Sequence, residues 1–153
     1  MGYPECEALV LTQLQAVTGF TPNAGISNTS RGDYSILNSG AGAVYGIVIP
    51  GTGNTDLGTA TVFYNKWETI VQIWQPYIDD GKTLTDLEAN VKNVITRFKQ
   101  YKHLGNSAII QDSEPTVVDK PVERWERGGD GPAFISQDIL LKYTEEEAVT
   151  YAE

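Results

Sequence analysis

The sequence predicts an α+β fold: a mixed or antiparallel sheet packed by one long amphipathic helix and a short N-terminal helix. Residues 66–75 alternate in side-chain direction and are mainly β-branched or aromatic, which is typical of a strand. Apolar residues then recur at steps of three and four over residues 84–104, which predicts a long helix with one apolar face. That face needs a sheet to cover it, because each large apolar side chain contributes about 1.5–3 kcal/mol when it is fully buried.

Two overlapping signals could begin this long helix. Thr85 and Glu88 have the spacing of a capping box, and Thr83 with Asp86 forms a competing start. Gly105 is placed to end the helix in a left-handed conformation. The predicted apolar face consists of Leu84, Leu87, Val91, Val94, Ile95, Phe98 and either Tyr101 or Lys102.

The N-terminal part of the chain predicts a short helix followed by loops and a hairpin. Pro4 suits a first helical turn, and apolar residues at helical spacing continue until Gly19. Residues 21–33 are expected to form a loop, and residues 33–38 and 43–50 are expected to form the two strands of a hairpin. A long exposed loop is then expected to begin at Pro50 and end at Thr59, and loops of this length are usually functional or disordered.

Further short strands are predicted on either side of the long helix, in residues 60–64, 107–111, 117–125 and 134–143. Pro121 interrupts the third of these, which argues for an edge position or a bulge. Residues 128–132 predict a turn, and the acidic segment 145–153 is expected to fray. The chain contains no internal repeat and no linker, so residues 1–153 are predicted to form a single domain.

Composition limits the classes of function. The chain carries 20 acidic and 11 basic residues, a formal net charge of -9, and no cluster of Lys and Arg, which disfavours direct nucleic-acid binding. One cysteine, Cys6, cannot form an internal disulfide, and one histidine, His103, cannot build a zinc site of the usual Cys/His type within one chain. No apolar run approaches the ~18 residues of a membrane span and the N-terminus lacks a secretion signal, so a soluble protein without membrane contact is expected.

The sequence predicts no catalytic, metal-binding or cofactor-binding residue. His103 lies near a helix end beside Lys102, where a helix-terminal cation is a more common role than a general base. No Ser or Cys stands in the context of a nucleophile elbow. Asp79, Asp80 and residues 145–147 lack the ligand spacing of a calcium loop and are interpreted as solvated charge on a turn and a tail. An enzyme is therefore not expected.

Three tryptophans are candidate anchors for other subunits. Strand alternation places Trp67 and Trp74 on opposite faces of the sheet, so a helix layer on one face leaves at least one of them in need of a second cover. Burial within the chain's own core is the default interpretation for these two residues and for Trp125. The alternative is a role at an intersubunit contact, where tryptophan is enriched.

The last two-thirds of the chain, roughly, carries four linked patterns. They are the strand 66–74, the acidic turn Asp79-Asp80-Gly81, the helix 84–104 with Arg97, Phe98 and Tyr101 at its end, and the closing strand 134–145. In type and spacing these patterns resemble the tail terminator proteins of tailed bacteriophages. The Gly-rich region 36–59 is longer than that family leads one to expect.

The resemblance implies a structural virion protein of the phage tail or neck, made in the host cytoplasm. Members of that family close the tail tube as a homohexameric ring, which implies contacts with further copies of the chain, with the tail tube protein and with a head-connector or head-completion protein. DNA would pass through the ring without specific binding, and net negative charge fits such a channel because clustered cations would trap DNA. The candidate interface residues are Trp67, Trp74, Tyr77, Trp125, Thr52, Asn54, Asp56, Arg127 and Asp130.

Three other classes stay open on the sequence alone. Another head–tail connector or head-closure protein would share these patterns. A small soluble ligand-binding module would need a concave apolar pocket with a few converging polar groups, which a sequence does not reveal. A carboxylate-based enzyme has the least support, because the sequence shows no paired acid and base.

Overall fold

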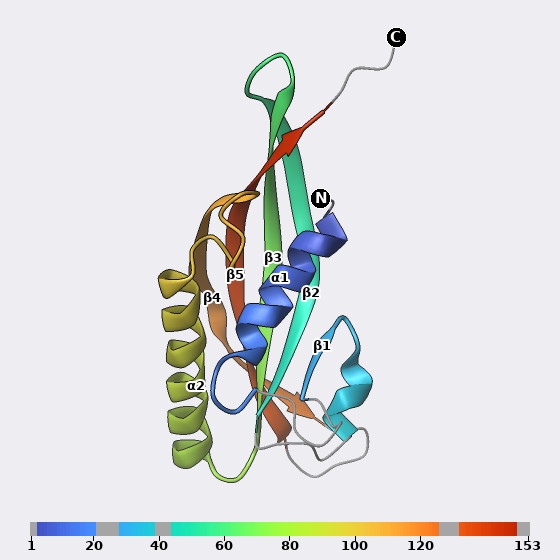
Figure 1. Cartoon of the computed structure of the whole chain (residues 1–153). Coiled ribbons are helices and arrows are strands. Elements are labelled where there is room, and N and C mark those ends of the chain that lie inside the picture. Colours follow the sequence, from blue (N-terminus) through green and yellow to red (C-terminus); the bar gives the residue numbers. More distant parts are fainter. Residues whose placement is uncertain (1–2, 21–27, 39–43, 126–131, 150–153) are drawn as a thin grey trace.

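The computed structural model describes residues 3–20, 28–38, 44–125 and 132–149. In chain order the elements are α1 (Tyr3–Gln15), β1 (Thr29–Arg31), the 3₁₀-helix η1 (Tyr34–Asn38), β2 (Tyr45–Leu57), β3 (Val62–Pro76), α2 (Asp80–Gln100), β4 (Ile110–Trp125) and β5 (Pro132–Ala148). The strands form one five-stranded sheet in the order β1-β2-β3-β5-β4, with β1 parallel to β2 and the other neighbours antiparallel (Figure 1). This mixed sheet with two α-helices confirms the predicted α+β fold.

One face of the sheet carries both α-helices and the main hydrophobic core. α1 buries Val10 and Leu14 completely, and α2 buries Val94 and Phe98 completely. Alternate residues of the strands join the same core, because successive side chains of a strand point to opposite faces. These strand residues include Val71 and Ile73 of β3 and Ile139, Leu141 and Tyr143 of β5.

The opposite face carries a smaller aromatic cluster beneath η1. Its buried members are Tyr45, Ile47 and Trp74, and Ile36 and Leu37 of η1 pack against them. The predicted strand at residues 33–38 is therefore wrong, because a helical turn aims these two apolar side chains at the cluster. The place beside β2 is taken by β1, which lies within the segment 21–33 that was predicted to be a loop.

The segment from Pro50 to Leu57 is a strand and not the predicted long loop. β2 continues beside β3 as far as Leu57, with a register shift between Pro50 and Gly53. Most side chains there are exposed, and the pairing uses backbone groups, so a Gly/Thr/Asn composition does not reveal it. Gly53 has a specific role, since a Cβ at this position would lie 2.0 Å from the ring of Trp67.

Several predicted short strands merge into longer ones. The segments 60–64 and 66–75 both contribute to β3, and β4 is continuous from Ile110 through 117–125. β4 is an edge strand whose register shifts between Val118 and Val122, so the edge position and the bulge predicted at Pro121 are confirmed. β5 continues to Ala148, so the prediction that the acidic end frays is wrong for residues 145–148. Residues 150–153 and most of the predicted turn 128–132 lie outside the described residues.

α2 begins earlier than either predicted capping box. Asp79 is the N-cap, and its carboxylate accepts a hydrogen bond from the backbone N–H of Lys82 at 2.7 Å. The Thr83 hydroxyl oxygen accepts from the backbone N–H of Asp79 at 3.2 Å, and the Thr85 hydroxyl donates to the Gly81 carbonyl within the helix. Asp79 therefore has a structural partner and is more than a solvated charge on a turn.

The C-terminal end of α2 agrees only in part with the prediction. Tyr101 is the C-cap, and Gly105 has a φ of 78°, so the left-handed conformation predicted for Gly105 occurs after the helix has ended. Leu84 and Tyr101, which were assigned to the apolar face, are 37% and 42% exposed. The guanidinium of Arg97 lies over the Tyr101 ring, 3.6 Å from its centroid.

Replacing Phe98 by alanine should destabilise the fold by about 3–5 kcal/mol, because its ring is fully buried and its loss leaves a cavity. Urea unfolding followed by circular dichroism measures the change in the free energy of unfolding. Ile78→Ala is the matched control, since Ile78 is 62% exposed and its truncation should change that free energy by no more than about 0.5 kcal/mol. Equal effects of the two substitutions would contradict the placement of the apolar face of α2.

Candidate functional site

The sheet extends beyond both α-helices as a three-stranded arm, formed by residues 53–57 of β2, 62–66 of β3 and 144–148 of β5. Figure 1 shows this arm at the upper end of the molecule, past the N-terminal end of α1. Across the arm, Leu57 is paired with Phe63, and Phe63 is paired with Glu147. The strand pairing therefore joins a hairpin, made by the end of β2 and the start of β3, to a segment of β5 that is distant in sequence.

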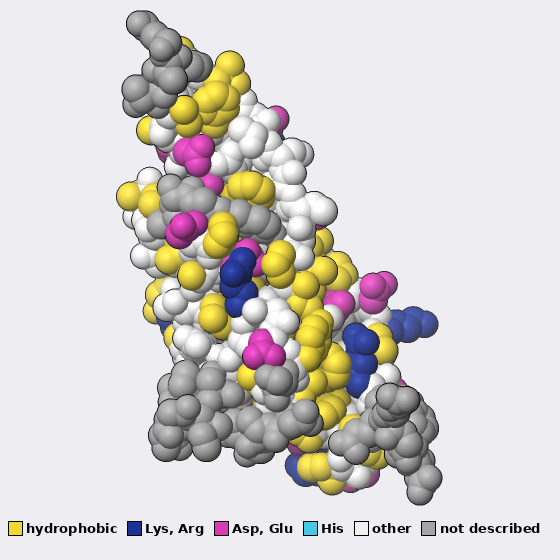
Figure 2. Space-filling view, turned by 90° about the vertical axis from the view of Figure 1, so that its right-hand side faces the viewer, with side chains coloured by type: hydrophobic (Ala, Val, Ile, Leu, Met, Phe, Trp, Pro, Cys, Tyr) yellow, Lys and Arg dark blue, Asp and Glu magenta, His cyan; other side chains and the backbone are white. Residues whose placement is uncertain are grey.

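The two faces of the arm differ. Strand alternation places Leu57, Phe63 and Glu147 on the side that carries the helices, and Leu57 is 63% exposed. We call these three residues the arm tip. On the other side, Lys66 and Asp56 form an exposed ion pair at 3.0 Å. Figure 2 shows hydrophobic side chains gathered at this end of the molecule.

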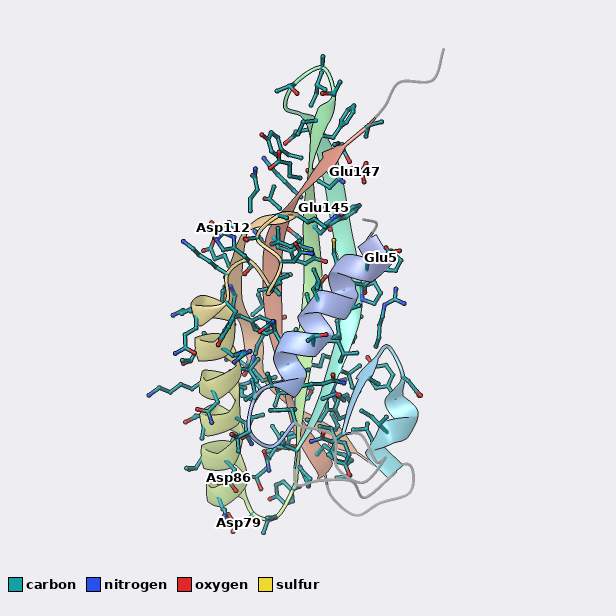
Figure 3. The ribbon with its side chains drawn as sticks, in the orientation of Figure 1. Glu5, Asp79, Asp86, Asp112, Glu145 and Glu147 are labelled. Carbon is teal, nitrogen blue, oxygen red and sulfur yellow. The ribbon has the colours of Figure 1, made fainter. Side chains whose placement is uncertain are left out.

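A buried carboxylate ties the base of the arm to α1. Glu145 is fully buried and accepts hydrogen bonds from Asn65 Nδ2 at 2.8 Å, Trp67 Nε1 at 3.2 Å and Cys6 Sγ at 3.4 Å (Figure 3). Burial, followed by the charge of Glu145, raises the pKa of Cys6 to about 12, so its thiol stays protonated and can donate. The interpretation of Glu145 as solvated tail charge is wrong, because β5 continues through it.

The two tryptophans of β3 lie on opposite faces, as predicted. Trp67 is half-buried, packs against the main core and lies close above Gly53, so it joins the arm to the body of its own chain. Trp74 is 8% exposed and belongs to the aromatic cluster beneath η1, which is the second cover that it needed. Their roles as intersubunit anchors stay predictions.

The other predicted interface residues are distributed over the molecule. Thr52, Asn54 and Asp56 lie on β2, toward or within the arm, while Tyr77 is half-buried against the main core directly after β3. Trp125 ends β4, where only its backbone position is described, and Arg127 and Asp130 lie outside the described residues. The structure thus places Thr52, Asn54, Asp56 and Trp67 in one region of the sheet, away from Trp74 and Tyr77. Within that region the Trp67 side chain lies on the helix side, whereas those of Asn54 and Asp56 lie on the opposite side.

A polar hollow of about 400 Å³ lies where the arm joins the sheet. Its lining includes Thr52, Asn54, Lys66, Glu68, Asp112, Glu114, Lys142 and Thr144. Charges compensate one another across the strands, with Lys142 3.8 Å from Glu68, but such exposed pairs contribute little free energy because water screens them. The hollow therefore resembles a hydrophilic contact surface more than an apolar ligand pocket.

An apolar groove of about 410 Å³ lies between α2 and the edge strand β4. Its helical wall is Leu87, Val91 and Ile95, at four-residue spacing, and its strand wall includes Val117 and Pro121. The exposed residues Lys92 and Lys99 also line this groove. Sequence reasoning missed the groove, although the four-residue spacing was visible, because its second wall depends on where β4 lies in the sheet.

The one histidine of the chain has a structural partner. His103 Nδ1 donates to the Ile110 carbonyl at 3.0 Å, because a carbonyl oxygen can only accept, and this bond closes the turn between α2 and β4. In the part of the chain that the structure describes, no three His, Cys, Asp or Glu side chains are grouped to hold a metal ion. The arm tip, the hollow and the groove are the features suited to contacts with macromolecules.

Comparisons with known proteins do not assign the chain to a family. No protein-family model matches the sequence, and no curated protein matches it at a significant level. Among the described helices, none is both long enough and apolar enough to span a membrane. The geometry of the arm and groove therefore carries the functional inference.

Replacing Glu145 by alanine should destabilise the fold by about 1–3 kcal/mol for each buried N–H donor that loses its acceptor, namely those of Asn65 and Trp67. Urea unfolding followed by tryptophan fluorescence measures the loss. The matched control is Glu146→Ala, since Glu146 is exposed on the adjacent position and its removal should cost no more than about 0.5 kcal/mol. A loss no larger than that of the control would refute the anchoring role of Glu145.

Asp138 provides a test of pH dependence. It is half-buried beside Gln72 on β3, and burial raises the pKa of its carboxyl above the ordinary 3.8, although the Arg124 charge and a hydrogen bond from Gln72 act in the opposite direction. The folded protein thus holds this proton more tightly than the unfolded chain does. The resulting stabilisation is fully present below the unfolded pKa and is lost as the pH rises through the folded pKa.

Asp138→Asn should therefore become more stable relative to the unchanged protein as the pH rises from about 4 to about 7. Urea midpoints measured at several pH values give this difference directly. Glu123→Gln, at an exposed position of β4, controls for the removal of one surface carboxylate. A difference that is constant with pH, or that changes in the opposite direction, would show that Asp138 does not titrate in this way.

Proposed function

We propose that this protein is a structural subunit of a tailed-bacteriophage virion, a tail terminator that forms a hexameric ring, caps the tail tube and joins it to the head connector. The observation that carries the proposal is the arm, which projects beyond the helices and leaves Leu57 63% exposed. When a partner covers a large apolar side chain at the end of a projecting element, apolar surface leaves water and the free energy of association becomes more favourable. Such an element suits a structural subunit that makes contacts with neighbouring subunits.

The separation of the arm from the groove supports a ring. The two surfaces are different patches of one chain. Contacts between different patches repeat head to tail, and they form a ring when the rotation between successive subunits closes. The arm lies at one end of the sheet (Figure 1), whereas the residues that line the groove belong mainly to α2 and β4. Each subunit would therefore contact one neighbour through each patch.

Charge supports the passage of DNA through such a ring. The net charge of -9 opposes adhesion of a phosphate backbone, since binding DNA requires clustered Lys and Arg. The polar hollow adds a hydrophilic surface on which two lysines partly compensate three carboxylates. Together these features suit a neck or tail component that DNA crosses without being held.

The purified protein should form an oligomer with six times the mass of the chain, visible as rings by negative-stain electron microscopy. Size-exclusion chromatography with light scattering measures the mass, alone and with tail tube protein added. Particles that lack the protein should carry tails of excess and irregular length, and supplying the gene in trans should restore the normal length. A strict monomer under every condition, or tails of normal length, would refute termination, and headless tails of normal length would indicate head closure instead.

A further inference from the structure

We propose that the arm tip of one copy docks into the groove between α2 and β4 of a second copy. This inference deepens the proposed function and rests on it, because it names the two surfaces that would join neighbouring subunits of the ring. The occupant of the groove is a second copy of this chain.

The groove is built to receive apolar side chains. Leu87, Val91 and Ile95 follow one another along one stripe of α2, and Val117 of β4 faces that stripe while remaining 45% exposed. A volume of about 410 Å³ accommodates the side chains of a hairpin end without requiring the helix to move. Leu87 and Val91 are already buried within the chain, at 1% and 7% exposed. A partner would therefore cover mainly Val117 and the half-buried Ile95, and removing their apolar surface from water favours association.

The arm tip has the complementary chemistry. The register places Leu57, Phe63 and Glu147 in one cross-strand row, so two apolar side chains lie beside one carboxylate on the same face. Leu57 is the most exposed of the large apolar side chains in the described residues, at 63%. No described residue forms an ion pair with Glu147.

The charges of the two surfaces are opposite. Between Glu88 and Asp112 the chain has no acidic residue, but it has four basic ones: Lys92, Arg97, Lys99 and Lys102. Two of these, Lys92 and Lys99, line the groove together with one carboxylate, Glu88, and neither lysine forms an ion pair within the described chain. In a protein of net charge -9, this local excess of cations favours an acidic partner surface, and another copy presents one at Glu147.

Beside the groove, the geometry favours docking over pairing at the β4 edge. β4 is one edge of the sheet, but Pro115 and Pro121 lack backbone N–H groups and the register is broken between Val118 and Val122. A neighbouring strand would therefore find no continuous ladder there. Within one chain the arm points away from the groove, so the contact joins two copies (Figure 1).

Engineered disulfide bonds test the contact directly. Leu57→Cys combined with Thr96→Cys, an exposed residue that lines the groove, should give a ladder of covalent oligomers on mild oxidation of the assembled protein. Leu57→Cys combined with Thr12→Cys, an exposed residue of α1 that does not line the groove, is the matched control and should give no ladder. Cys6 does not interfere, because it is fully buried and its pKa is raised to about 12.

Charge reversal gives an independent test. Lys92→Glu combined with Lys99→Glu should weaken oligomer formation at least tenfold, and adding Glu147→Lys should recover part of that loss. Leu57→Asp should also weaken it at least tenfold, since a carboxylate would enter the apolar groove. All of these positions except Glu147 are exposed, and circular dichroism is the check that each variant is folded.

The outcomes separate this inference from the proposed function. A ladder for the 57–96 pair together with rescue by Glu147→Lys supports docking of the arm tip in the groove. Rings that form normally in the Leu57→Asp variant, or a Leu57→Cys cross-link to the tail tube protein in place of a second copy, would overturn the docking and leave the ring standing. A protein that never assembles would overturn both.

Discussion

The antiparallel pairing of β3 with β5 is the constraint on which the other layers depend. It runs without a register shift from Val62 opposite Ala148 to Pro76 opposite Phe134, and so passes through both the core and the arm. Because side chains alternate along a strand, this one register decides which residues lie beneath the helices and which lie on the opposite face. A slip by one residue would exchange the two faces and move Val71 out of the core.

Polar contacts hold the N-terminal helix where apolar burial alone would leave its position less defined. They join α1 to three other elements: Cys6 to Glu145 of β5, Glu7 to Arg31 of β1 at 2.9 Å, and Gln13 to Arg97 of α2 at 3.0 Å. The Glu7 side chain is 1% exposed and that of Arg31 is 45% exposed, so the cation keeps part of its hydration while it compensates a buried carboxylate. These bonds offset the cost of removing charged and polar groups from water.

In the proposed ring, the body of the chain supplies the stability of the fold and the arm supplies contacts for assembly. The body contains the main core, whereas the arm has few buried apolar side chains and depends on its strand pairing and on the bonds made to Glu145. An element of this kind gains apolar contacts only from a neighbour. Within one chain, Leu57 has little apolar cover and the groove beside α2 is open. The two surfaces are therefore complementary between two copies.

Local side-chain patterns were enough to predict β3, α2, the opposite placement of Trp67 and Trp74, and the edge bulge near Pro121, because alternation, helical periodicity and a missing N–H act within a few residues. They were not enough to reveal the parallel pairing of β1, the strand from Pro50 to Leu57, or the groove. Thr52, Asn54 and Asp56 were correctly predicted to be exposed, but in a loop, since backbone pairing leaves no mark on side-chain composition. Only the tertiary structure decided these features, and with them the burial of Glu145, because its hydrogen-bond donors come from a helix and a strand far away in the sequence.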